Sequence, residues 1–420
     1  MNHIEDLNLE KEVLPLFDFT TNHFSKNKIL EILNHTLKSE DDIYHRQNIF
    51  KAFLKNDILQ EYSYTAMNFY EVKEFLTNSK DLAYFSNILH YKIVSSKQNR
   101  IRNKSKIIQV ILFFHRLEVK YFKRIILRDF PDLYANRLKK ILEFLSFFQL
   151  EYYEYLIREN KLKDSDVIKI YDKLIRVREK GLITNFWGEL FLFEAYLSIS
   201  LGIDRYQFIF PKITNDNLDL RDIYHPLVAN PIKNNFQSAN NVFVLNGPNM
   251  SGKSVFLKSI SLCFYLAHIG FGVPASKAII PFCNFFSISI SKKDEILSGY
   301  SHFMNEIKHL KAVIKQARNG KSCFVVFDEL FSGTNVEDAY EISNTSIRGM
   351  EKFDNSYFFI SSHIQQLQKC LGDKVSNFYL DCIIVDGNPK FNYLLKEGWS
   401  DIKIGKVLFE LEGLNQLLDE

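Results

Sequence analysis

The chain has 420 residues, of which 46% are hydrophobic, 15% aromatic and 25% charged, and its formal net charge at pH 7 is +3. This length and apolar content are enough for two domains with real cores. The five cysteines are odd in number and widely spaced without a C-x-x-C pair, which argues against a disulfide framework or a zinc site. The acidic start is unlike a signal peptide, and we expect a cytoplasmic protein.

Residues 1–205 are predicted to be helical. Proline occurs there only at Pro15 and Pro131. Residues 141–157 are dense in leucine, phenylalanine and tyrosine at spacings of three and four, which predicts one long packed helix.

Basic residues are concentrated between Lys92 and Lys140, where fourteen Lys or Arg accompany three Asp or Glu. Such a cluster could neutralise several DNA phosphates and give salt-sensitive binding of little sequence preference. The alternative is a solvated helix face with a basic loop.

The composition changes after residue 205. Residues 206–240 contain Pro211, Pro226 and Pro231 and many asparagines, which mark the entry to a second domain. Residues 241–420 then alternate strand-like and helix-like stretches, which predicts an α/β domain with a mostly parallel sheet.

The motif G-x-x-x-x-G-K-S occupies Gly247 to Ser254. An apolar run at 241–245 precedes it and predicts a buried strand, and residues 254–267 follow with helical spacing. Strand, glycine loop and helix in this order place nucleotide phosphates at a helix N-terminus. A chance glycine turn before a core helix is the alternative.

Specific atoms are needed at such a loop. Gly247 and Gly252 let the backbone approach the phosphates without a Cβ. Lys253 should reach the β- and γ-phosphates, and the hydroxyl of Ser254 should bind Mg²⁺.

Two further strand-like runs end in polar side chains. Residues 323–327 are apolar and are followed by Asp328 and Glu329. We expect Asp328 to hold Mg²⁺ and Glu329 to orient or deprotonate the attacking water. Residues 357–360 lead to His363, which could sense the γ-phosphate. Taken alone, the two acids would be a helix N-cap region and the histidine a loop residue.

Residues 246–254, Asn-Gly-Pro-Asn-Met-Ser-Gly-Lys-Ser, resemble the phosphate loop of the MutS family, usually G-P-N-M-G-G-K-S. Five more segments resemble that family in the same order: His225-Pro226-Leu227-Val228, Gly270 to Ala275 (G-x-x-V-P-A), Ser298 to Glu306 (S-G-x-S-T-F-x-x-E), Asp328 to Asn335 (D-E-x-x-x-G-T-S/N) and Ser362-His363.

The resemblance implies an ABC-type ATPase that works as a dimer. Ser298 and Gly299 would then cap the γ-phosphate held by the other subunit, from a helix that starts near Ser301; an ordinary helix start has the same sequence. Ser251 replaces a glycine of the usual loop, His302 a threonine, and Ser332 an arginine common in mismatch-reading members.

The expected fold is therefore an all-α domain, similar to the family's lever and core, at residues 1–205, followed by a P-loop ATPase domain at residues 206–420. ATP and Mg²⁺ are the expected cofactors, and DNA and a second copy or a related family member the expected partners. The expected catalytic residues are Lys253, Glu329 and His363, and the metal ligands Ser254 and Asp328. The expected nucleotide-binding residues are Gly247, Pro248, Asn249, Met250, Ser251, Gly252, Lys253, Ser254, Val255, Ser298 and Gly299.

Phe69-Tyr70-Glu71 mimics the Phe-x-Glu with which full-length members of the family enter mismatched DNA. Because it lies inside the helical region, we interpret it as a coincidence in a packed helix. The sequence thus resembles a short form without the mismatch-reading domain, and we expect no C-terminal helix-turn-helix after residues 414–420.

Three functions compete. The leading hypothesis is a DNA-associated ATPase of mismatch repair or a related repair or recombination process. The second is an ATP-gated interaction module that regulates a repair partner without reading mismatches. The third, a chromosome scaffold with long coiled-coil arms, is disfavoured because no heptad arms flank the ATPase halves.

Overall fold

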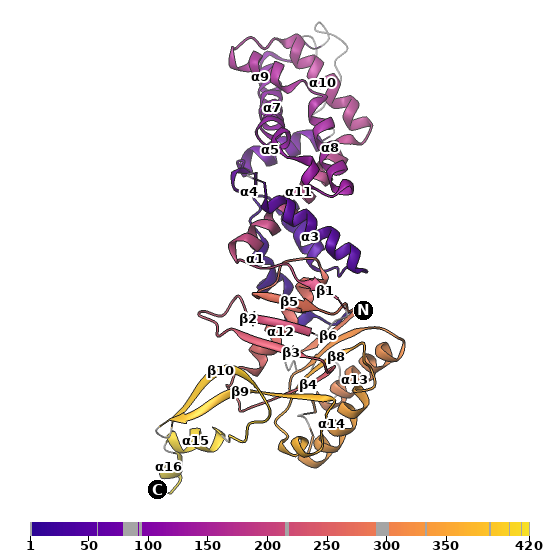
Figure 1. Cartoon of the computed structure of the whole chain (residues 1–420). Helices are drawn as coiled ribbons and strands as arrows, with labels where there is room; N and C mark the ends of the chain where they lie inside the picture. The colour runs from indigo at the N-terminus through magenta and orange to yellow at the C-terminus, as the bar shows by residue number, and fades with distance from the viewer. Residues whose placement is uncertain are drawn as a thin grey trace. The chain divides into compact units, whose positions relative to one another are not determined.

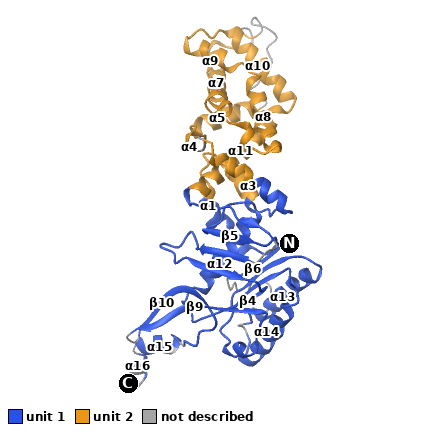
Figure 2. Cartoon of the chain, viewed as in Figure 1, with its two compact units in different colours: residues 1–16, 33–47, 205–420 blue, residues 17–32, 48–204 orange. Residues whose placement is uncertain are grey.

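The computed structural model describes the chain except for residues 1, 57, 79–90, 92–94, 215–217, 291–301, 332–333, 386–387, 403, 413 and 420. The chain forms two compact units (Figure 2). Unit 1 comprises residues 1–16, 33–47 and 205–420, and unit 2 comprises residues 17–32 and 48–204.

Unit 2 is helical, as the sequence predicts, and its helices carry the labels of Figure 1. They are α2 (His23–Leu33), α3 (Glu40–Leu54), α4 (Ile58–Glu61), α5 (Ala66–Thr77), α7 (Lys97–His115), α8 (Asp132–Ser146), α9 (Leu150–Arg158), α10 (Asp164–Glu179) and α11 (Leu182–Arg205), of which α2, α3 and α11 reach the border with unit 1. Aromatic side chains fill the core; Phe114, for example, packs edge-on against Phe144 and Phe186.

The predicted single helix over residues 141–157 is wrong. Helix α8 ends at Ser146 and α9 begins at Leu150, because Gln149 has a φ of 57° and this left-handed conformation stops a helix. Lys173 Nζ donates to the carbonyl of Phe147 at 3.1 Å, so a side chain from α10 satisfies one of the carbonyls left unpaired at the break. Apolar spacing continues across the break because both helices bury one face, and periodicity alone therefore hides it.

Among the described residues, α11 alone has the length and apolar composition to cross a membrane, and 78% of its most apolar window is buried within the structure. Phe69 of α5 is fully buried and packs edge-on against Trp187 of α11. The Phe-Tyr-Glu triplet thus lies in a packed helix, as interpreted from the sequence.

Unit 1 is an α/β unit with two sheets. The larger has the order β10-β9-β4-β8-β7-β6, with β9 and β10 antiparallel and the other neighbours parallel. The smaller mixes both directions in the order β1-β5-β2-β3. The strands are β1 (Lys212–Ile213), β2 (Leu218–Ile223), β3 (Asn234–Ser238), β4 (Val242–Asn246), β5 (Lys277–Ile280), β6 (Phe285–Ser289), β7 (Cys323–Phe327), β8 (Tyr357–Ser361), β9 (Val375–Val385) and β10 (Asn388–Glu397).

Helices cover both faces of the larger sheet. Phe324 of β7 stacks on Phe264 of α12 (Lys253–His268), whereas Val325, the next residue, joins the core formed with α13 (His302–Arg318) and α14 (Val336–Met350). This alternation is the period of two expected of a strand buried on both faces. Two short helices follow at the C-terminal end, α15 (Ile404–Leu411) and α16 (Leu414–Asp419).

The compact units divide the chain between residues 204 and 205, and two N-terminal segments, residues 1–16 and 33–47, also belong to unit 1. The amide of His3 donates to the carbonyl of Phe286 at 2.9 Å, and the amide of Ile288 donates back to His3 at 2.7 Å, which extends the larger sheet beyond β6. From the second segment, Tyr44 and Gln47 donate side-chain hydrogen bonds to the carbonyls of Ile213 and Pro211. Hydrogen bonds between residues so far apart in the chain leave no local signal in the sequence.

Candidate functional site

The glycine loop joins β4 to α12 at the carboxyl end of a central strand, in the context the sequence predicts. Gly247 and Gly252 have φ values of 133° and 96°, conformations that side chains with a Cβ rarely adopt. Ser251, which replaces a glycine of the usual motif, is absent from the residues with positive φ, so its Cβ causes no backbone strain. Its hydroxyl is fully buried and has no hydrogen-bond partner among the described residues.

Lys253, the first residue of α12, is 6% exposed. Its ammonium donates to the carbonyls of Gly247 at 2.8 Å and Pro248 at 3.0 Å, so the loop wraps around it. Burial lowers the pKa of Lys253 to about 8, although Glu329 and Asp328 act in the opposite direction. A desolvated cation held among loop carbonyls at a helix N-terminus fits a polyphosphate, which would exchange those weak acceptors for charged oxygens.

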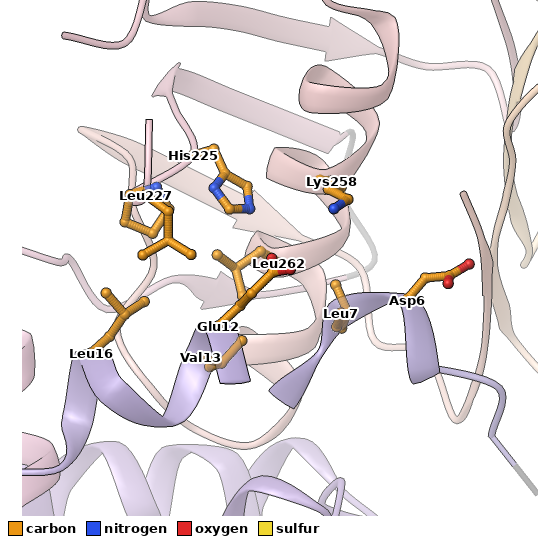
Figure 3. A pocket seen from close by; sticks show the side chains of 10 residues that line it. Asp6, Leu7, Glu12, Val13, Leu16, His225, Leu227, Lys258 and Leu262 are labelled. Atoms are coloured by element: carbon orange, nitrogen blue, oxygen red, sulfur yellow. The ribbon is translucent and has the colours of Figure 1, made fainter. Parts of the chain in front are cut away.

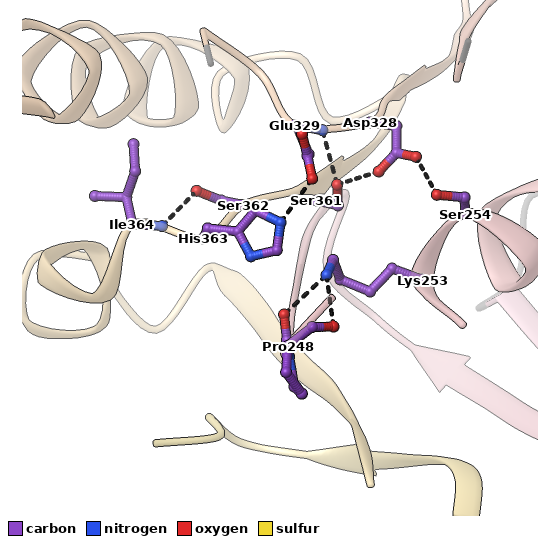
Figure 4. Close-up of polar contacts among 10 residues, drawn as sticks. Pro248, Lys253, Ser254, Asp328, Glu329, Ser361, Ser362, His363 and Ile364 are labelled. Atoms are coloured by element: carbon purple, nitrogen blue, oxygen red, sulfur yellow. Dashed lines mark hydrogen bonds and ion pairs between the residues drawn. The ribbon is translucent and has the colours of Figure 1, made fainter. Parts of the chain in front are cut away.

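Asp328 directly follows β7, which is the second strand from β4 in the sheet order. Its side chain nevertheless reaches Ser254, which follows the glycine loop (Figure 4). One oxygen of its carboxylate accepts a hydrogen bond from Ser254 Oγ at 2.5 Å, and the other accepts from the hydroxyl of Ser361. Ser361 ends β8, the strand between β4 and β7, and its position there explains how it bridges the two sides. The hydroxyl and carboxylate oxygens of Ser254 and Asp328 are the ligand type that Mg²⁺ prefers, so the pair fits this ion.

Glu329 and His363 form a second pair at the same edge. His363 Nε2 and Glu329 Oε1 are 2.6 Å apart (Figure 4). Glu329 has a φ of 58°, and its amide donates to Ser361 Oγ at 2.8 Å. The carboxylate is therefore held by a backbone turn on one side and by the imidazole on the other.

A cavity of about 630 Å³ opens beside the glycine loop. Its walls come from residues 223–232, which contain the His-Pro pair, from the first turn of α12 and from the β9–β10 hairpin. Tyr393 of the hairpin lies directly over the loop, since a Cβ added to Gly252 would lie 3.1 Å from its ring. Sequence reasoning missed Tyr393, because only the fold of the hairpin brings it back over residue 252.

His225 lines both this cavity and a small pocket of about 10 Å³ beside the N-terminal segment. Figure 3 shows the small pocket. Glu12 and Lys258 also line the small pocket. Burial lowers the pKa of His225, while nearby Glu12 raises it and Lys258 lowers it further. Residues 6–16, which carried no motif, thus line a pocket that shares His225 with the larger cavity.

The structure does not describe all of the predicted site. Ser298 and Gly299, and likewise Ser332 and Gly333, lie outside the described residues. Helix α13 begins at His302, close to the helix start expected near Ser301.

The basic residues between Lys92 and Lys140 are partly engaged within unit 2; Lys92 itself lies outside the described residues. Lys104 Nζ donates to the carbonyl of Leu162 at 2.7 Å, Lys123 pairs with Glu151 at 2.8 Å, and Arg124 pairs with Glu61. Eight other members are exposed: Lys97, Arg102, Arg116, Lys120, Arg128, Arg137, Lys139 and Lys140.

The fold defines an α/β protein. Its glycine-rich loop and two acidic side chains, Asp328 and Glu329, lie together at the carboxyl ends of the sheet's strands. Residues 243–417 match the family model for MutS domain V. The DNA mismatch repair protein MutS of Ehrlichia ruminantium (strain Welgevonden) is 32% identical over 259 residues, which are 60% of this chain and 31% of that protein. MutS of Bacillus mycoides is 26% identical over 243 residues, 55% of this chain and 27% of the relative.

This chain contains a MutS domain V segment, residues 243–417, which carries the glycine loop and both acidic side chains. It spans about a third of the length of these curated relatives.

Proposed function

We propose that this protein is a MutS-type ATPase that binds ATP and Mg²⁺ at the Gly247–Val255 loop and couples hydrolysis to its grip on DNA. The observation that carries the proposal is the contact between Ser254 and Asp328, 74 positions apart in the chain, beside the buried ammonium of Lys253. These three side chains supply a cation for phosphate oxygens and two oxygen ligands for a divalent metal.

Each described side chain has a role in this proposal. Lys253 binds the terminal phosphates, Ser254 and Asp328 hold the metal, and Glu329 orients a water and accepts its proton. Mg²⁺, when bound, supplies charge neutralisation at the phosphate oxygens. His363 fixes the Glu329 carboxylate through their 2.6 Å contact.

The cavity beside the loop is the proposed place of the base and ribose. Gly252 of the loop and Val255 of helix α12 line this cavity. The rest of its lining is mostly apolar with a few polar groups, as is typical of small-molecule sites. Tyr393 offers a ring on which a purine can stack.

The proposed active form is a dimer in which Ser298 and Gly299 of one copy close the nucleotide held by the other. This step rests on the family resemblance of residues 298–306 and on the position of α13, which starts at His302, within that segment.

Replacement of Lys253 by alanine tests the nucleotide site. We expect at least a hundredfold weaker binding of a fluorescent ATP analogue, because a charge-assisted contact to two phosphates is lost in a desolvated site. The matched control is Lys315→Ala, which removes an exposed lysine from α13. Unchanged binding and turnover in Lys253→Ala would reject the site.

DNA binding is tested on exposed members of the basic cluster. Lys97→Glu combined with Arg102→Glu should weaken binding of duplex DNA and reduce its salt dependence, because two phosphate contacts are lost. Lys369→Glu with Lys374→Glu changes the net charge equally at exposed positions of unit 1 and should have little effect. Fluorescence anisotropy at two salt concentrations measures both.

The second candidate function is an ATP-gated module that regulates a protein partner. It is favoured by the internal contacts of Lys104, Lys123 and Arg124, which occupy part of the basic cluster. Retained ATP binding without DNA binding at low salt would select this function over the first.

A further inference from the structure

Unit 2 carries a groove of about 930 Å³ that the nucleotide site does not use. It is lined by residues of α8, α10 and α11 and by Lys28 of α2. All of these residues belong to unit 2, which is orange in Figure 2. Its apolar lining includes Phe144, Val177 and Phe186, which are buried, and Phe147 and Leu182, which are 45% and 40% exposed. On an ordinary protein surface, exposed apolar residues occur singly. Here exposed apolar side chains instead line a continuous hollow.

The polar lining is predominantly basic. Five basic residues line the groove, with two acidic ones, Glu143 and Glu189. Three of the five basic residues are already paired with carboxylates at 2.6 Å: Lys28 with Glu31, Arg137 with Glu189 and Arg176 with Asp172. The five basic residues are Lys28, Arg137, Lys140, Arg176 and Lys180. The groove therefore presents an apolar floor beside two lysines, Lys140 and Lys180, which have no ion pair among the described residues.

Gly188 keeps part of the floor open. It lies inside α11, where glycine costs about 1 kcal/mol relative to alanine. A Cβ added at this position would meet no heavy atom within 4 Å, and its φ is not in the range that favours glycine. Neither the backbone conformation nor packing against the described residues requires a glycine at this position. Gly188 does line the groove, so a larger side chain there would occupy part of the groove's volume.

We propose that this groove binds an amphipathic helix of a partner protein, with leucine-like side chains on the floor and acidic side chains against the two lysines. An amphipathic helix in a groove is a common mode of peptide recognition, and opposite charge beside the groove sets orientation and speeds association. Nucleic acid fits less well, because charged phosphates cannot fill the apolar floor. The proposal is independent of the nucleotide site.

The probe is a fluorescein-labelled peptide of about 18 residues, roughly five helical turns, with leucines at i, i+3, i+4 and i+7 and glutamates on the other face. The protein is the full chain. We expect saturable binding of this peptide, and at least tenfold weaker binding of a version in which lysines replace the glutamates. No saturable binding of the acidic peptide would overturn the proposal.

Two sets of variants locate the binding. Gly188→Phe should weaken it at least tenfold by filling the floor, whereas Gly188→Ala should leave it within about twofold, because a methyl group is small beside the groove. Lys140→Glu with Lys180→Glu should also weaken it at least tenfold. Lys139→Glu with Lys169→Glu, an equal charge change on α8 and α10 outside the groove, should not.

Unchanged peptide binding in Lys140→Glu/Lys180→Glu would place the peptide elsewhere and overturn the proposal even if Gly188→Phe fails to fold. An unlabelled thymidine oligonucleotide serves as competitor. If it displaces the peptide and loses its own affinity in the same charge variant, the groove is a nucleic-acid site and the proposal is wrong.

Discussion

Lys253 is the side chain whose protonation decides the chemistry of the loop, and this leads to a prediction about pH. Burial lowers its pKa to about 8, so the free protein loses this positive charge as pH rises through that value. Bound phosphates stabilise the charged form, and the Kd for nucleotide should therefore rise above about pH 8, by up to tenfold per pH unit. Titrations of a fluorescent ADP analogue between about pH 7.5 and 9.5 measure this.

The control for that experiment is Lys253→Met, which has no titrating group at the position. It should bind more weakly, and its Kd should change little over the same pH range. An equally steep pH dependence in the methionine variant would assign the effect to another group.

Glu194 supports a second prediction at the residue scale. It is buried in α11 and accepts hydrogen bonds from Asn22 at 2.7 Å, Ser25 at 2.5 Å and Tyr62 at 2.7 Å. Burial raises the pKa of Glu194, although these hydrogen bonds oppose the shift. A raised folded-state pKa contributes stability that is complete below the ordinary carboxyl pKa and is lost as pH rises through the folded value.

The free energy of unfolding of the wild type, relative to Glu194→Gln, should therefore fall as the pH rises above the ordinary carboxyl pKa of 4.5. Urea unfolding of both proteins at several pH values measures the difference. A difference that grows with pH would contradict the assigned cause.

Site residues could be predicted from the sequence where they lie in a motif of characteristic residue types and spacing. Residues that the fold alone brings to the site could not be predicted. Lys253, Ser254 and Asp328 stand in recognisable segments, and the structure brings them together. Their roles with a nucleotide stay predictions. Tyr393 lies in no motif, and it reaches Gly252 only because β10 folds back on β9.

At the scale of elements, the strands near the site were predicted within a residue. The apolar runs at 241–245, 323–327 and 357–360 correspond to β4, β7 and β8. Buried parallel strands are continuous apolar runs, which makes them easy to detect. The break between α8 and α9 could not be detected, because it depends on the conformation of Gln149 and on a contact from Lys173.

Helix α11 gives a prediction about stability. Gly188→Ala should stabilise unit 2 by about 1 kcal/mol, because alanine is the better helix former and its methyl group meets no atom. The chain has two tryptophans, and Trp187 lies in unit 2 while Trp399 lies in unit 1. In a Trp399→Phe background, urea unfolding followed by the fluorescence of Trp187 reports on unit 2.

The matched control is Gly181→Ala in the same background. Gly181 has a φ of 69°, so alanine there is strained and should destabilise the same unit. Equal effects of the two substitutions would contradict the account of Gly188.

At the scale of the whole molecule, the proposed closure of two copies around ATP predicts a change in mass. Glu329→Gln should bind ATP but hydrolyse it at least a hundredfold more slowly, because the group that accepts the proton of water is lost. The closed dimer should then accumulate, and light scattering after size-exclusion chromatography should show about twice the monomer mass with ATP.

The double variant Lys253→Ala/Glu329→Gln provides the control, since it removes the nucleotide contact and should stay at the mass of the nucleotide-free protein. A monomer that holds ATP stably in the single variant would argue against closure by a second copy.

The division of the chain between the units has a consequence for its synthesis. Unit 2 is complete once residue 204 has been made, whereas Asn2 must wait for Phe286, 284 positions later, before its side chain can accept the hydrogen bond from that amide. At translation speeds of about 5–20 residues per second this delay is roughly 15–60 s. Unit 2 therefore emerges from the ribosome before the N-terminal segment can pair with the sheet. During this delay, residues 1–16 are among the first segments that a chaperone for exposed apolar chain can bind.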